Sequence, residues 1–300
     1  EPYDKGSYMK SITIALGNTP ISNIFLEAQT AALNLEPKAI KPIHRAFRPM
    51  TEDTAFDVSE LAIVTAIQAM EHNRNIVPLP ISIASRIQHK CIIKNNNFTN
   101  LTPADLEGRR VAVRAYSQTT GAWVRTILDT EYGVDCTKIE WITQEPPHVT
   151  DAPEPYNVIR DPNGASPLEL IENGDVDAAI FGNDLPDAAW VKSVIRNAEE
   201  AGKVSLEKTK ITQINHILAV SRGFFEQRED DVKRIMLGFH SARQQLSDDE
   251  QRMLPMGQDE MQTSVETLLQ SAFRQGLIGR KLRFNDIFGH GMNLYQALSL

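Results

Sequence analysis

The feature that most constrains the fold is the alternation of short, β-branched apolar runs with longer helical patterns along most of the chain. This alternation predicts an α/β protein whose sheets are mostly parallel and flanked by helices. The expected strands are Ser11–Leu16, Phe56–Leu61, Ile76–Leu79, Lys90–Lys94, Arg110–Arg114, Ile139–Ile142, Ala178–Phe181 and Ile214–Val220. The expected helices between them are Ser22–Leu33, Glu60–Glu71, Pro103–Glu107, Thr120–Tyr132, Pro167–Asn173 and Leu185–Asn197.

The C-terminal part of the chain has a different pattern. It predicts three helices with no strand between them, Glu226–Leu246, Met261–Gln275 and Leu294–Leu300. The polar stretch NNNFTN at 95–100 separates two strand–helix series, and INHILAV resumes an apolar strand before these helices. We therefore expect two lobes, one from residues 9–93 plus 217–300 and one from 94–216, with a ligand cleft between them. The polar, Pro-rich span 144–167 is expected to be a surface loop over that cleft.

Composition excludes several classes of protein. Among 300 residues, 31 Lys and Arg stand against 39 Asp and Glu, a net charge of −8 that argues against a nucleic-acid binder. No apolar run approaches the ~20 residues of a membrane helix. The two cysteines, Cys91 and Cys136, belong to no metal-binding or disulfide pattern. We expect a small-molecule partner, and a homo-oligomer stays open.

The N-terminus bears on location. Residues 1–8 (EPYDKGSY) are interpreted as an addition to the natural chain, which would then start at Met9 and enter a strand at once. This predicts a cytoplasmic protein. The alternative is a periplasmic protein whose signal peptide has been removed.

Candidate site residues follow the predicted strands, because ligands collect beyond the carboxyl ends of strands and between lobes. The most informative segment is VAVRAYSQTTGAWVR, where a strand ends in Arg114 and a helix begins near Thr119 or Thr120. Free backbone N–H groups, hydroxyls and the positive helix end suit an anion such as a carboxylate. The alternative is an ordinary helix cap. The full candidate set is Asn18, Glu60, Ser82, Arg86, His89, Arg114, Tyr116, Ser117, Thr119, Thr120, Asn183 and His216.

Several of these residues also have purely structural interpretations. Arg86 offers a planar fork for a carboxylate, but it could equally pair with a surface acid. His216 lies in an apolar strand, as a catalytic group or as a core histidine bonded to backbone. Glu60 could be only a first-turn acid of the following helix. The histidines show no metal-ligand spacing, and no dinucleotide or triphosphate motif occurs, so we expect neither a metal nor a cofactor.

These segments together resemble the 4,5-dihydroxyphthalate decarboxylase family. The resemblance is strongest where the pattern LxPxDLxGxRVxV is followed by YxxTxxxWxR, within LTPADLEGRRVAVRAYSQTTGAWVR. The first pattern is shared with type II periplasmic solute-binding proteins. The pair Arg86 and His89, and the dipeptide Asn215–His216, are more selective. Further matching segments are FDVSELA, PLPISIASRIQHKCIIKN, ENGDVDAAIFGND and MQTSVETLLQSAFRQGLIGRKLRFNDIFG.

The resemblance implies a two-lobed periplasmic-binding-protein-like fold. It also implies non-oxidative loss of CO2 from a hydroxylated aromatic dicarboxylate held between the lobes. On this hypothesis Arg86 and Arg114 orient carboxylates, and the proton donor is His216 or Glu60, with His89 as the other candidate. The remaining candidates would complete the substrate pocket: Asn18, Ser82, Tyr116, Ser117, Thr119, Thr120 and Asn183.

Two other functions use the same fold. One is a non-catalytic solute-binding protein for a small carboxylate, of the kind that serves an ABC transporter, in which hinge closure on the ligand is the whole function. The other is a protein related to those that handle pyrimidines or thiamine precursors, which predicts a stacking pocket and less need for two arginines.

Overall fold

The computed structural model describes residues 10–298, so the expectation for residues 1–8 and Met9 concerns residues outside the described part. The strands are β1 Ile12–Ala15, β2 Leu35–Pro37, β3 Val58–Ala62, β4 Ile76–Ser85, β5 Ile92–Asn95, β6 Arg110–Val113, β7 Glu140–Thr143, β8 Val158–Arg160, β9 Ala178–Ile180, β10 Val191–Ser193 and β11 Ile214–Ser221. The helices are α1 Pro20–Gln29, α2 Phe47–Asp53, α3 Ile63–Glu71, α4 Thr119–Tyr132, α5 Pro167–Asn173, α6 Ala198–Thr209, α7 Arg222–Gln227, α8 Glu229–Arg243, α9 Asp248–Met253, α10 Gly257–Arg274 and α11 Phe284–Gln296. Short 3₁₀ turns are η1 Ile43–Ala46, η2 His89–Cys91, η3 Pro103–Asp105 and η4 Cys136–Lys138.

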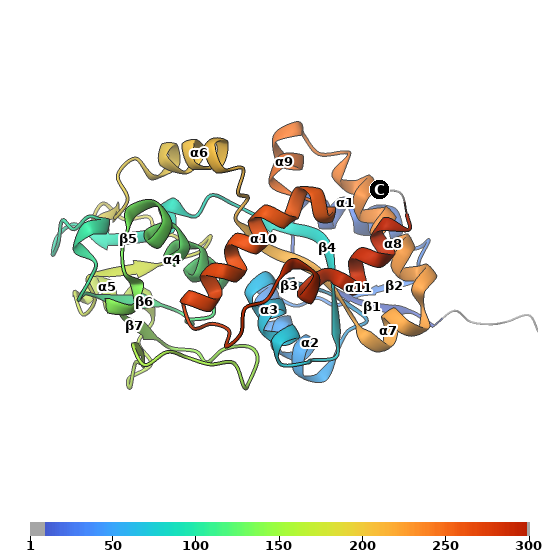
Figure 1. Ribbon diagram of the computed structural model, residues 1–300, viewed down its shortest axis with the longest axis horizontal. Coiled ribbons are helices and arrows are strands. Elements are labelled where there is room, and N and C mark those ends of the chain that lie inside the picture. Colours follow the sequence, from blue (N-terminus) through green and yellow to red (C-terminus); the bar gives the residue numbers. More distant parts are fainter. Residues whose placement is uncertain (1–9, 299–300) are drawn as a thin grey trace, which may run out of the picture.

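Within residues 10–298 the strands form two sheets, which confirms the predicted fold class. The first has the order β2-β1-β3-β11-β4 and the second the order β10-β5-β9-β6-β7-β8. Pairing is parallel among β2, β1 and β3 and among β9, β6, β7 and β8, and antiparallel where β11, β5 and β10 join. We call the part built on each sheet the first and the second lobe (Figure 1).

Local sequence explains most of these elements. In β6, Val111 and Val113 pack into the main core while Ala112 packs into a second core, as the two-residue period of a strand requires. Helix α5 begins where Ser166 and Glu169 form a reciprocal capping box, and it ends at Gly174, whose φ is 77°. Its bounds are those predicted from the sequence.

One expected helix, Leu185–Asn197, is wrong. The segment instead contributes the short edge strand β10, which pairs antiparallel with β5. The helix starts only after Asn197, which is left-handed with φ 50°, and its sequence AEEAGKVSLEKT has too few apolar residues to give a clear helical period. In this segment, pairing with the sheet outweighed the local preference of the residues. Two further edge strands, β2 and β8, were not predicted from the sequence because each is only three residues long.

The chain passes from the first sheet to the second between Ser85 and Ile92, and returns between Ser193 and Ile214. We propose that the lobe boundaries lie in the segments 86–91 and 210–213. These positions are a few residues before the predicted boundaries at 93/94 and 216/217, since β5 already belongs to the second sheet and β11 begins in the first.

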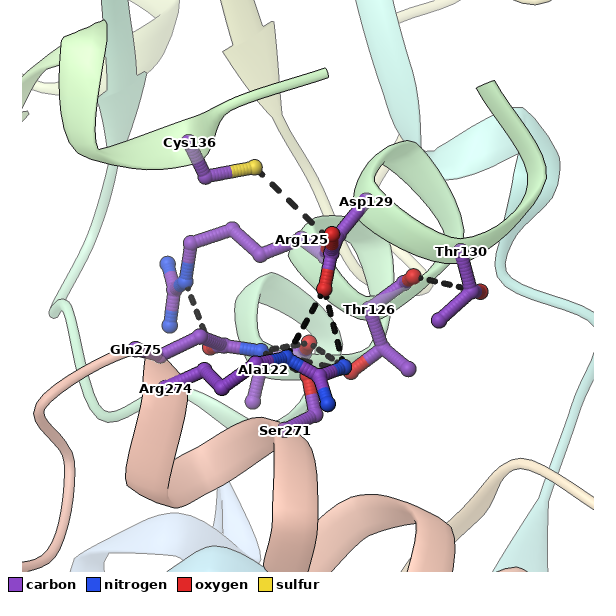
Figure 2. Close-up of polar contacts among 9 residues, drawn as sticks. All are labelled: Ala122, Arg125, Thr126, Asp129, Thr130, Cys136, Ser271, Arg274 and Gln275. Carbon is purple, nitrogen blue, oxygen red and sulfur yellow. Dashed lines mark hydrogen bonds and ion pairs between the residues drawn. The ribbon is translucent and has the colours of Figure 1, made fainter. Parts of the chain in front are cut away.

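Helix α10 links the two lobes. In Figure 1 it runs from the first lobe to the second, where its C-terminal end lies against α4. Gln275, just beyond this end, donates from Nε2 to the carbonyl of Ala122 at 3.0 Å and to Ser271 Oγ at 2.8 Å. Arg274 forms an ion pair with Asp129 at 2.8 Å (Figure 2). The predicted helix Met261–Gln275 therefore ends in the second lobe.

Arg125 is the centre of this contact. Its side chain is fully buried, and no carboxylate bonds it within the described residues. Nε donates to Gln275 Oε1 at 2.7 Å and Nη2 to the carbonyl of Tyr116 at 2.6 Å. The guanidinium also lies 3.9 Å from the ring centroid of Tyr116 and 5.1 Å from that of Trp141. Burial lowers the pKa of Arg125, so its charge depends on these neutral partners.

Replacing Gln275 by Ala is expected to destabilise the protein by about 2–4 kcal/mol, because it leaves a buried guanidinium N–H without an acceptor. Urea unfolding measures the change. Gln270→Ala, at an exposed position on the same helix, should stay within about 0.5 kcal/mol of the parent. Equal stability of both variants would contradict this role for Gln275.

Candidate functional site

The two sheets bring their loop-bearing edges together. β11 runs antiparallel to β3, so the start of β11 lies at the same edge as the end of β3. In the second lobe the carboxyl ends of β6, β7 and β9 share an edge because these strands are parallel to β6. Most of the candidate residues predicted from the sequence lie at these two edges.

Glu60 and His216 form a close pair. Glu60 pairs across the sheet with Leu218 and His216 with Ala62, so the two side chains are diagonal neighbours on one face. Nδ1 of His216 lies 2.6 Å from Glu60 Oε1. The pairing of β11 with β4 is irregular on both sides of His216, as bulged strands are near functional sites. The expectation that Glu60 opens a helix is therefore wrong, since β3 continues through Ala62.

The Glu60 carboxylate is almost completely buried, with 1% of its surface exposed. Its second oxygen, Oε2, accepts a hydrogen bond from the Gly17 N–H at 2.6 Å. A Cβ at position 17 would lie 2.9 Å from that oxygen, so the close approach requires glycine. Both carboxylate oxygens are thus satisfied, which fixes the imidazole of His216 in place.

Arg114 follows β6 in the second lobe, and Nη1 lies 3.0 Å from Glu145 Oε2. Its charge acts on two histidines. Burial, and next the charge of Arg114, lower the pKa of His148 to about 4. The same two causes lower the pKa of His44. The site therefore joins one guanidinium with imidazoles that are neutral near pH 7.

His148 lies in the predicted loop after β7 and contacts the first lobe. Its Nδ1 is 2.9 Å from Thr65 Oγ1, in the first turn of α3. The Phe47 ring meets His148 edge-on at 5.5 Å and His216 at 5.2 Å, measured between ring centroids. Phe47 thus packs against both imidazoles, one from each lobe.

The residues after His148 fasten the same loop to the first lobe. Arg48 donates to Thr150 Oγ1 at 3.1 Å, and the Thr150 N–H donates to Glu52 Oε1 at 2.9 Å. Arg74 pairs with Asp151 at 2.8 Å. We call residues 148–151 the clasp, because they bridge the lobes beside the candidate site.

Arg86 gathers two other predicted residues. Its Nη2 donates to Thr120 Oγ1 at 2.7 Å, and its Nη1 donates to Asn183 Oδ1 at 2.5 Å. Arg86 follows β4, Thr120 begins α4, and Asn183 follows β9. The guanidinium of Arg86 thus joins the segment 86–91, where the chain crosses between the lobes, to the edge of the second sheet.

The first turns of α3 and α4 meet at the same interface. The Val64 N–H donates to Thr119 Oγ1 at 3.3 Å. Two positive helix ends from different lobes therefore converge, and free N–H groups at such ends attract anions. Ser117 is buried in the turn before α4. Asn18 follows Gly17 and accepts a hydrogen bond from Asn23 of α1 at 2.8 Å.

His89 lies elsewhere. The structure does not place it beside the other candidate catalytic residues, contrary to the expectation from the sequence. It is completely buried, and its Nε2 is 2.9 Å from Glu131 Oε2. Glu131 is twelve residues beyond Thr119 on α4, which corresponds to roughly 18 Å along the helix. His89 therefore packs at the far end of α4 from the candidate site, beneath Gly202 of α6.

Ser82 and Tyr116 use their hydroxyls within the fold. Ser82 is buried and donates to the Pro255 carbonyl at 2.6 Å. Tyr116 is buried and donates to the Gln275 carbonyl at 2.8 Å. The hydroxyls that were expected to bind substrate thus tie the lobes to the C-terminal part of the chain.

Sequence reasoning missed His44, His148, Phe47 and Glu145. The only signal was the unusual loop that contains His148 and Glu145, which was predicted to lie over a cleft. His44 and His148 belong to no metal-ligand spacing in the sequence, and these residues come together from distant segments. Within residues 10–298, no group of three or more His, Cys, Asp or Glu side chains could hold a metal ion.

The lobes are in contact at this interface. The bonds of Thr119 and of the clasp cross between them. Cavities of about 520 and 630 Å³ border α6.

Solved structures share this architecture. The aliphatic sulphonate binding protein SsuA of Escherichia coli matches with a TM-score of 0.58 and 13% identity, over 92% of this chain and 91% of that one. A putative periplasmic sulfonate-binding protein of Methylobacillus flagellatus matches with a TM-score of 0.56 and 11% identity, over 97% and 95% of the two chains. The fold is that of a periplasmic binding protein. At such identities the likeness concerns the fold alone.

The sequence resemblance is also confirmed, although no family model matches. The chain is 26% identical, over 196 residues, to a curated protein named 4,5-dihydroxyphthalate decarboxylase of Comamonas testosteroni, covering 61% of this chain and 58% of that protein. A Pseudomonas putida protein of the same name is 25% identical over 99 residues, 33% of this chain and 37% of that protein. The chain thus aligns with little more than half of the first relative. Every helix in residues 10–298 is too short or too polar to cross a membrane.

The lowered pKa of His148 predicts a loss of stability in acid. Unfolding returns the imidazole from a pKa of about 4 to its ordinary 6.5, so the unfolded chain binds the extra proton in this range and stability falls as pH drops from 6.5 to 4. In His148→Gln, the fall in the free energy of unfolding between pH 6.5 and pH 4 is expected to be about 2–3 kcal/mol smaller than in the parent. Urea unfolding at several pH values measures it, with His290→Gln, exposed on α11, as control. Parallel pH curves for the parent and His148→Gln would contradict the prediction.

Proposed function

We propose that the chain decarboxylates a hydroxylated aromatic dicarboxylate, such as 4,5-dihydroxyphthalate, between its two lobes. The observation that carries the proposal is the pairing of buried Glu60 with partly exposed His216 at the interface that also holds Arg114. The similarity to curated proteins named for this activity supports it. The chain spans only part of those proteins, so the substrate belongs to the proposal.

The two guanidinium groups suit a dicarboxylate. Arg114 would hold one carboxylate, exchanging part of its contact with Glu145. Arg86, with Thr120 and Asn183, would hold the other. Paired N–H donors match the oxygens of a carboxylate, and guanidinium keeps its charge when water is excluded. The converging starts of α3 and α4 would add N–H donors for negative charge that develops on the ring oxygens.

His216 would supply the proton. Because Nδ1 is bonded to Glu60, Nε2 is the nitrogen that can exchange a proton with a ligand. In the reaction the bond between the ring carbon and the carboxylate breaks, and CO2 leaves. The electron pair of that bond forms a new C–H bond with the proton from the imidazolium, which is then reprotonated by water. Glu60 acts through His216 as a positioning residue.

A second function, binding without chemistry, is favoured by the structural neighbours, which are named as sulfonate-binding proteins. The same lobes and cationic groups would close on a small aromatic carboxylate and release it unchanged. Release of CO2 from 4,5-dihydroxyphthalate by the purified protein separates the two functions. Binding with quantitative recovery of the ligand would favour the second. The cytoplasmic location and a homo-oligomer stay predictions.

His216→Gln is expected to lower the rate of CO2 release at least about 100-fold, because positioned proton transfer contributes roughly 10²–10⁴-fold. The folded variant should still bind the dicarboxylate. His290→Gln, exposed on α11, should keep the parent rate. A His216→Gln variant with full activity would remove this residue from the mechanism.

Arg114→Ala is expected to weaken binding of 4,5-dihydroxyphthalate about 10- to 100-fold, since charge-assisted hydrogen bonds are lost and Glu145 is left unpaired beside the ligand. Calorimetric titration measures the affinity. Arg110→Ala is the matched control, because Arg110 begins β6, the strand that Arg114 follows, is exposed and pairs with Glu140. Equal affinities of the two variants would place the ligand elsewhere.

A further inference from the structure

His148 is a histidine that the proposed mechanism does not use, yet it lies beside the candidate site. The clasp carries it from the second lobe onto the first, where its Nδ1 bonds Thr65 at 2.9 Å. Its ring contacts Phe47, which also contacts His216. With Nδ1 engaged, Nε2 is the nitrogen that can meet a ligand between the lobes.

The surroundings of His148 disfavour a charge on its ring. Burial is the main cause, followed by the charge of Arg114 at the end of β6, with His44 of η1, Arg48 of α2 and His216 of β11 acting in the same direction. The nearby carboxylates are already engaged, Glu145 by Arg114 and Glu60 by both His216 and the Gly17 N–H. Without a ligand the imidazole is therefore neutral near pH 7.

We propose that His148 takes up one proton from solvent when a dianionic aromatic ligand binds at the lobe interface, and that it thereby selects doubly charged over singly charged ligands. The inference rests on the proposed function only for the position of the ligand, and needs no turnover. The proton goes from water to the imidazole on binding and returns on release, and no other bond is made or broken.

The physical reason is charge balance. Arg114 offsets a single carboxylate, so a monoanion brings little net negative charge to His148. The second carboxylate would accept from Arg86 and keep an oxygen for His148, and an opposite charge within hydrogen-bond reach favours the protonated ring. The imidazolium then donates to that oxygen in an environment with little water, where a charge-assisted bond is strong. A monoanion obtains no such bond.

The test uses phthalate, which lacks the ring hydroxyls, and benzoate as its singly charged counterpart. Calorimetric titrations at pH 6.5 in buffers of different ionisation enthalpy give the protons taken up per ligand. We expect roughly half to one proton with phthalate, almost none with benzoate, and phthalate affinity that rises several-fold from pH 8 to 6.5. In His148→Gln the uptake should disappear and phthalate affinity should fall about 10-fold, with benzoate affinity unchanged.

Two controls locate the proton. His44→Gln and His290→Gln should keep most of the uptake, and persistence of uptake in His148→Gln with loss in His44→Gln or His216→Gln would overturn the assignment. Phthalate binding without uptake in the parent would overturn the inference and leave decarboxylation standing. Uptake with phthalate but no CO2 from 4,5-dihydroxyphthalate would support the inference and reject the enzyme. Failure to bind either dicarboxylate would overturn both proposals.

Discussion

The return of the chain into the first sheet is the constraint on which the rest of the structure depends. β11 enters between β3 and β4 after the whole second sheet has been built, and it pairs antiparallel with both. This register places His216 diagonally across from Glu60, at the edge where the lobes meet. It also makes the chain cross between the two sheets twice.

Buried charge is handled in two different ways on the two sides of the interface. Glu60 is hydrogen-bonded by a histidine and a backbone N–H, an arrangement that leaves the second nitrogen of the imidazole available for chemistry. Arg125 is instead surrounded by an amide, a carbonyl and two aromatic rings, which hold the end of α10 against α4. The first arrangement places a reactive group, and the second fastens the lobes together. Both need partners from segments far apart in the sequence.

Prediction from sequence succeeded where the signal was local. The eight expected strands recur as β1, β3, β4, β5, β6, β7, β9 and β11, because apolar β-branched runs between turn residues report burial directly. The edge strand β10 was predicted as a helix because its conformation depends on its pairing with β5. Residues that follow strands could be chosen as site candidates because the ends of these strands are also visible in the local sequence. Arg86, Thr120 and Asn183 do come together, whereas Ser82 and Tyr116 proved to be structural.

The sequence by itself determined the two-lobed α/β architecture and the kind of group that lies at the strand ends, since both follow from short-range periodicity and capping. It also carried the resemblance to the decarboxylases. Only the tertiary structure decided which ionisable groups meet. His148 reaches Thr65, and Phe47 reaches both His148 and His216, through contacts between lobes that no spacing along the chain encodes. The protonation of a side chain depends on burial and on neighbouring charge, and both exist only once the lobes are packed together.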